Sequence, residues 1–212
     1  MPVLLKGDSN MALMPMTYAP GTVARRFTIL EEVTIRDTLY QVIWDEKTPF
    51  AAVIEAMPSV TDSSPRHNVV ATLELQRRPQ LEGVFVKKFW EDADVAQIEG
   101  IVVDGSMRDI GLATLVYELV ANKAGVTLLS DNEQYEGGKA LWQHIARSST
   151  ALKVFILDTD TAQYIPFDGE RICYDGNSIS EGEIWSEPPD RSKYRVVLVA
   201  EPCNKQHQPV VC

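Results

Sequence analysis

The residues from Arg108 to Ala113 combine types and spacing that suit the binding of a phosphate group. Arg108, Gly111 and Ala113 follow the pattern Arg-x-x-Gly-x-Ala, directly after the apolar run Ile98–Val103 and at the start of an amphipathic stretch. The amino end of a helix offers unpaired amides and the positive end of the helix dipole, and both attract phosphate. Small residues let a phosphate approach the backbone, and the arginine adds a cation. The segment therefore predicts a strand-to-helix turn that holds a pyrophosphate.

One carboxylate on the preceding strand is a candidate for proton transfer. Glu99 lies within the apolar run, before the turn. If a reacting amine lies over that strand, Glu99 could act as its general base, directly or through a water molecule. The alternative is a strand carboxylate that faces solvent or pairs with Lys87 or Lys88. Both interpretations stay open at this point.

A second group of polar residues follows the next apolar run, at 126–129. Asp131 stands at the carboxyl end of that predicted strand, where the ligands of open sheets gather, so it could position an amine or remove its proton. Ser130 and Asp131 could equally cap the turn before the next helix. Tyr135 could donate a proton, although a tyrosine at a helix start more often packs. His144 is more typical of a surface or core residue, and the three histidines lack the spacing of metal ligands.

Composition restricts the class of protein. The chain has 212 residues, is 45% hydrophobic and carries a net charge of −10, which allows a sizeable core. The acidic balance argues against nucleic-acid binding. No apolar run approaches the roughly 18 residues of a membrane span, and the first residues lack a signal-peptide pattern. Cys173, Cys203 and Cys212 form no CxxC pair, so we expect reduced thiols and a cytoplasmic protein.

The hydrophobic patterns predict many strands followed by a strand–helix–strand–helix–strand series and one late strand. Arg36-Asp37 is the expected hairpin turn and Gly125 the expected end of the first helix. This order indicates an α+β (mixed α/β) domain, in which a largely antiparallel sheet contains a βαβα unit with two parallel strands. The expected strands are 26–35, 38–46, 50–57, 69–76, 84–90, 98–103, 126–129, 153–157 and 194–200, and the expected helices are 108–123 and 135–147.

The remaining segments are expected to be irregular. Residues 1–21 read as an irregular arm, Pro58–Asn68 as a loop, 166–193 as a long excursion with turns and 201–212 as a flexible tail. A single domain is therefore expected over 22–200.

The Arg-x-x-Gly-x-Ala segment, in this setting, resembles the acetyl-CoA signature Arg/Gln-x-x-Gly-x-Gly/Ala of the GNAT N-acetyltransferase superfamily. Leu128-Leu129-Ser130-Asp131 and Gly138-x-x-Leu141-Trp142-x-x-Ile145 resemble the later strand and helix, in a form found in bacteriophage-encoded acetyltransferase-like proteins. The resemblance covers about residues 95–157. It implies a GNAT-like fold whose core lies there, with acetyl-CoA as the co-substrate.

The resemblance also implies a binding site and an acceptor. The pantetheine arm would lie where Ile101–Val103 splays from Val126–Leu129. The acceptor would be an amine on a small molecule or a host protein, in the host cytoplasm if the protein is phage-encoded. The oligomeric state stays open, a dimer included. The candidate catalytic residues are Asp131, Glu99 and Ser130, from their positions described above. The cofactor-binding residues that the resemblance implies are Ile101, Val102, Val103, Arg108, Asp109, Ile110, Gly111, Leu112 and Ala113.

Two departures from the family pattern bear on activity. Many GNAT enzymes carry a tyrosine on the second helix that protonates the leaving thiolate, and here Trp142 stands at that position while Tyr135 replaces a usual asparagine. An indole N–H cannot serve as that acid. The strand-rich first half also differs from the family's helical acceptor site. The alternative function is therefore a catalytically degenerate GNAT-fold protein that binds other proteins, such as a phage effector or a virion-associated component. A β-rich structural protein with a coincidental motif is a third interpretation.

Overall fold

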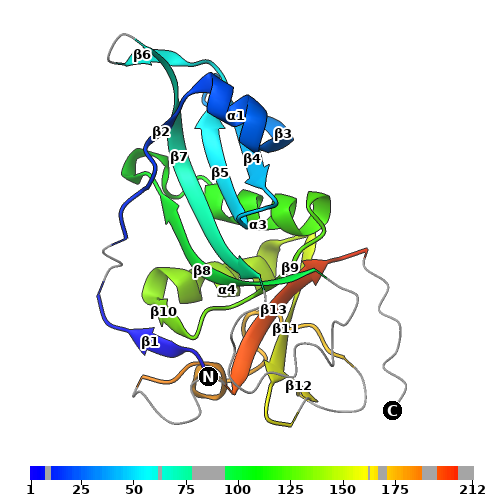
Figure 1. Cartoon of the computed structure of the whole chain (residues 1–212). Helices are drawn as coiled ribbons and strands as arrows, with labels where there is room; N and C mark the ends of the chain where they lie inside the picture. The colour runs from blue at the N-terminus through cyan, green and yellow to red at the C-terminus, as the bar shows by residue number, and fades with distance from the viewer. Residues whose placement is uncertain are drawn as a thin grey trace. The chain divides into compact units, whose positions relative to one another are not determined.

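The computed structural model describes residues 1–7, 11–61, 64–77, 94–161, 163–166, 171–187 and 195–204. These residues form a mixed α+β structure with mainly antiparallel strands and few helices (Figure 1), which confirms the expected fold class. The chain divides into two compact units. Unit 1 comprises Met1–Ser9, Arg77–Gln97 and Gly125–Cys212, and unit 2 comprises Asn10–Gln76 and Ile98–Ala124. The expectation of one domain over 22–200 stays a prediction.

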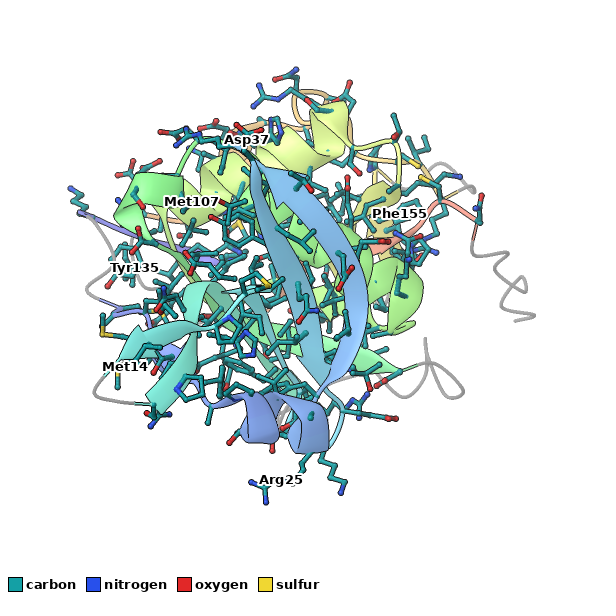
Figure 2. All side chains as sticks on the ribbon, turned by 90° about the horizontal axis from the view of Figure 1, so that it is seen from above. Met14, Arg25, Asp37, Met107, Tyr135 and Phe155 are labelled. Carbon is teal, nitrogen blue, oxygen red and sulfur yellow. The ribbon has the colours of Figure 1, made fainter. Side chains whose placement is uncertain are left out.

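Unit 2 is built on an antiparallel sheet in the order β3-β4-β5-β7, with β8 next to β7. Arg36 and Asp37 connect β3 to β4 with φ angles of 48° and 64°, as a two-residue hairpin turn of this kind requires. Figure 2 labels Asp37 at this tip, and the predicted turn is confirmed. The strands are β3 (Thr28–Ile35), β4 (Thr38–Asp45), β5 (Phe50–Glu55), β7 (Ser64–Arg77) and β8 (Val95–Val103).

Helices cover both faces of this sheet. Helix α3 (Leu112–Lys123) packs on β3, β4 and β5, and its Lys123 pairs with Glu31 at 2.6 Å. The opposite face carries Ile43, whose cluster includes Val23 from helix α1 (Pro20–Arg26). That cluster contains Tyr18, Val23, Ile43, Phe50, Ala52, Ile54 and Val69, with Leu13 and Phe27 packed against it.

Helix α1 and a strand at Ser59–Thr61 are among the short elements of unit 2 that the sequence did not predict. The predicted first strand began at Arg26, but Pro20 starts helix α1 instead, where a proline is favoured because its missing N–H has no intrahelical partner. The predicted loop Pro58–Asn68 is also wrong. Strand β6 (Ser59–Thr61) pairs with the first residues of β7. An edge position tolerates the prolines that suggested a loop.

Unit 1 contains the parallel strand pair that the sequence predicted. Val95–Gln97 of β8 pairs with β9 (Thr127–Leu129) in parallel register. Strand β13 (Val196–Pro202) pairs antiparallel with β9 on one side and with β11 (Leu152–Asp158) on the other. Strand β12 (Gln163–Ile165) pairs antiparallel with the other edge of β11. One hydrophobic cluster of this unit contains Val95, Leu129, Phe155, Leu157, Val197 and Val199.

The expected irregular arm is in part a strand of unit 1. Strand β1 (Val3–Leu5) pairs in parallel with β10 (Glu133–Tyr135), just before helix α4 (Glu136–Ser148). The 166–193 excursion contains helix α5 (Glu181–Ile184), and its Ser186 exchanges backbone hydrogen bonds with Pro2 and Leu4. Pairing with distant segments therefore orders Val3–Leu5 of the first stretch and Ser186 of the second. None of the helices in the described ranges is long and apolar enough to cross a membrane.

Candidate functional site

The turn between β8 and α3 has a defined backbone. A single 3-10 turn covers Gly105–Met107, Asp109 has a φ of 61° and Gly111 has a φ of 82°. These left-handed residues cannot belong to an α-helix. The helix therefore starts at Leu112 rather than at Arg108, which corrects the predicted start. Gly111 becomes the N-cap residue.

Contacts within unit 2 hold this turn in place. The Asp104 amide donates to the Val70 carbonyl at 2.8 Å. The Asp104 carboxylate accepts from the Ser106 amide at 2.9 Å and from its hydroxyl at 2.6 Å, and these bonds from Ser106 lower the pKa of Asp104. The buried Tyr40 hydroxyl lies 3.9 Å from the Met107 sulfur. Strands β7 and β4 thus both anchor the turn.

The electrostatics of the turn suit an anion. Because Gly111 is the N-cap, no side chain at the cap accepts hydrogen bonds from the first amides of α3. Those amides and the dipole end are therefore available to a ligand. A Cβ on Gly111 would meet no other atom of the described residues, so lack of space does not require a glycine there. The positive φ of the position does, because residues with a side chain rarely adopt it. Arg108 and Asp109 are exposed, Ile110 is half-buried and Ala113 is half-buried on the first turn.

The strand before the turn offers a strip of side chains in unit 2. Glu99 is exposed, and Ile101 and Val103 follow on the same face of β8, both half-buried. Gly100 and Val102 lie on the other face, where a Cβ on Gly100 would collide with the Met11 side chain. The solvent-facing interpretation of Glu99 agrees with its exposure. Its other suggested partners, Lys87 and Lys88, lie outside the described residues.

Ser130 and Asp131 lie together at the carboxyl end of β9 in unit 1. Ser130 is fully buried, its hydroxyl oxygen accepts from the Leu198 amide at 3.0 Å and its own amide donates to the Leu198 carbonyl. That bonding fits a role in joining β9 to β13. Asp131 is half-buried and accepts from the Asn132 amide at 2.6 Å. The N-cap of α4 is Tyr135, so neither residue caps that helix.

Helix α4 has no exposed proton donor at position 142, where the resembled family carries a tyrosine. Trp142 is buried at 2% exposure, as a core residue. Tyr135 is half-buried at the helix start and pairs with Leu5, while His144 is exposed. Within the described ranges, no three His, Cys, Asp or Glu side chains are placed to hold a metal ion.

Two polar residues near β9 were missed by reading the sequence. Gln97 is buried, and its Nε2 donates to the Ser130 carbonyl at 3.3 Å, just beyond the last backbone pair of β8 with β9. Asn132 follows Asp131. For Asn132, the run Ser-Asp-Asn at the end of a strand was a signal that the sequence offered. Gln97 offered no signal, because it lies inside an apolar strand.

These arrangements can bind an anion at the start of α3 and can handle protons at Glu99 or at Asp131. No protein-family model matches the chain, and no curated protein matches it.

Proposed function

We propose that the protein is an acetyl-CoA-dependent N-acetyltransferase of the GNAT type. The observation that carries the proposal is the turn from Arg108 to Gly111, which leads from β8 into an α3 amino end without a side-chain cap. That end would hold the pyrophosphate, with Arg108 as an additional cation. Residues Ile101–Val103 of β8 would bind the pantetheine arm, with the half-buried Ile101 and Val103 side chains on the same face.

Strand order supports the proposal. In unit 1, β13 pairs antiparallel with both β9 and β11, so the strands on either side of α4 belong to one sheet. The parallel pairing of β8 and β9 is the one expected of the βαβα unit that carries the resemblance.

Acetyl transfer needs few protein groups. The amine nitrogen attacks the thioester carbonyl, the new C–N bond forms, and the C–S bond breaks with the electron pair leaving on sulfur. Glu99 would take the proton from nitrogen. The buried Trp142 cannot protonate the leaving thiolate. The thiolate would therefore take its proton from water.

The second candidate is a non-catalytic GNAT-fold module that binds another protein. The burial of Trp142, at the position where the family carries an acid, favours it. Cleavage of the acetyl-CoA thioester with any amine or protein extract, lost in a Glu99→Gln variant, would exclude this candidate.

Calorimetric titration with CoA tests the proposed site. Gly111→Glu puts a negative charge at the expected pyrophosphate position. At an effective dielectric constant of about 20, two charges about 4 Å apart repel by about 4 kcal/mol, so affinity should fall at least tenfold. Gly125→Glu is the matched control, because Gly125 has a φ of 74° and open space at the other end of α3. Equal affinity in the two variants would refute the site.

A further inference from the structure

An arginine of the 166–193 excursion lies against two aromatic rings in unit 1. The Arg171 Cζ atom is 3.6 Å from the centre of the Phe155 ring and 4.3 Å from the centre of the Tyr164 ring. The two ring centres are 5.8 Å apart and their planes meet at 66°, so the rings form two walls of a corner. Burial raises the pKa of Tyr164 to about 12, and its ring therefore stays neutral. The guanidinium thus occupies a cation–π site with two walls.

A buried carboxylate completes this corner. Glu201 has a side chain that is 2% exposed, and its Oε2 atom lies 2.8 Å from Arg171 Nη2. A carboxylate that is removed from water needs a positive charge beside it. Phe155 on β11, Tyr164 on β12 and Glu201 on β13 form what we call the cation cage, and strand register places all three on one face of the sheet. Aromatic cages also hold quaternary ammonium ligands.

Arg171 fills the cation cage without satisfying its own hydrogen-bond donors. Among the described residues, its buried Nε and Nη2 atoms have no aligned acceptor, although Nη2 is within ion-pair distance of Glu201. Buried donors without acceptors destabilise the arrangement, and water would satisfy them. The Arg171 side chain is 19% exposed, and the next backbone anchor is the Tyr174 amide, which donates to the Val154 carbonyl at 2.8 Å. The side chain can therefore withdraw into water while this anchor holds the segment on β11.

We infer that the cation cage binds a small quaternary ammonium ion, and that Arg171 is its internal competitor. A quaternary ammonium has no N–H group, so it leaves no donor unmet in the cage, whereas the guanidinium leaves two nitrogen atoms unmet. It brings the same charge to Glu201 and an apolar shell to the two rings. The displaced guanidinium regains hydrogen bonds with water. The cage lies within unit 1 and does not depend on binding of acetyl-CoA.

Nuclear magnetic resonance titration of the full-length wild-type chain with choline tests this inference. The matched probe is dimethylbutanol, in which carbon replaces the charged nitrogen. Choline should shift the Nε–H signal of Arg171 to saturation, because the guanidinium leaves the rings, and dimethylbutanol should leave that signal unmoved. Phe155→Leu removes one aromatic wall and should weaken choline binding about tenfold. Arg171→Ala removes the competing cation and should tighten choline binding about tenfold.

The controls separate a ligand cage from a structural ion pair. Arg195→Ala should bind choline as wild type does, because Arg195 also pairs with a buried carboxylate, that of Asp158 at 2.8 Å, but its own side chain is 48% exposed. A wild-type Arg171 signal that choline leaves unmoved, or that dimethylbutanol shifts equally, would overturn the inference. Choline binding by Arg171→Ala alone would also overturn it, since Arg171 would then be a fixed structural partner of Glu201.

Two further points complete the test of the cation cage. Arg171→Ala leaves Glu201 without its counter-charge, and if that variant does not fold, the wild-type and Phe155→Leu titrations decide the question. Choline and a trimethyl-lysine peptide carry the same group on a free molecule and on a protein. The tighter of the two identifies the source of the ligand, and absence of binding by both would overturn the inference.

Discussion

The left-handed backbone at Gly111 makes a stability prediction that does not depend on any ligand. Gly111 has a φ of 82°, and a Cβ there would meet no atom within 4 Å. Replacement by alanine therefore adds backbone strain without a steric clash. That strain is about 1–2 kcal/mol for a non-glycine residue in the left-handed region. In a protein of this size it lowers the melting temperature by about 2–8 °C.

Thermal and urea unfolding of three variants measures this strain. Gly125→Ala should cost about as much as Gly111→Ala, because Gly125 has a φ of 74° and equally open surroundings. Gly111→Asn should cost less, since asparagine adopts this region more readily. A Gly111→Ala variant as stable as wild type, with Gly125→Ala destabilised, would show that Gly111 is not left-handed and would remove the basis for the phosphate-binding turn.

Three further predictions concern other parts of the chain. Burial alone would raise the pKa of Asp45, but hydrogen bonds from Arg26 and from amides of the following turn lower it below 3.8. The Asp45 carboxylate therefore stabilises the fold fully above that pH, and this stabilisation is lost as the pH falls through the lower pKa of the folded state. The difference in unfolding free energy between wild type and Asp45→Asn should shrink on acidification, and a constant difference would contradict the ion pair. Ser130→Ala leaves the buried Leu198 amide without its acceptor and should cost about 1–3 kcal/mol in urea unfolding, and a cost below 0.5 kcal/mol would be too small for that bond. Glu99→Gln should lower kcat for acetyl transfer by at least about 100-fold with CoA affinity unchanged, whereas equal kcat would assign the base elsewhere.

The features that local chemistry determines could be predicted from the sequence. Arg36-Asp37 forms the expected turn, and Gly125, with a φ of 74°, follows the end of α3 as expected of a C′ glycine. Helix α4 begins one residue from its predicted start, and the strand at 152–158 matches its apolar run. In each case, the signal lies within a few neighbouring residues.

The features that depend on distant partners could not be predicted. Strands β1, β6 and β10 are three residues each, too short for a hydrophobic period, and pairing with other segments defines them. The start of α3 was misplaced because the sequence does not reveal the positive φ of Asp109. The role of Ser130 depends on Leu198, which lies 68 residues later.

Calorimetric titration with acetyl-CoA and with S-acetylpantetheine tests the central claim most directly. The two ligands share the thioester and the pantetheine arm, but only acetyl-CoA carries the pyrophosphate that the amino end of α3 would hold. We expect acetyl-CoA to bind at one site, with affinity that falls as salt is added, and S-acetylpantetheine to bind at least tenfold more weakly. No binding of acetyl-CoA, or equal affinity for the two ligands, would contradict a pyrophosphate site at Gly111.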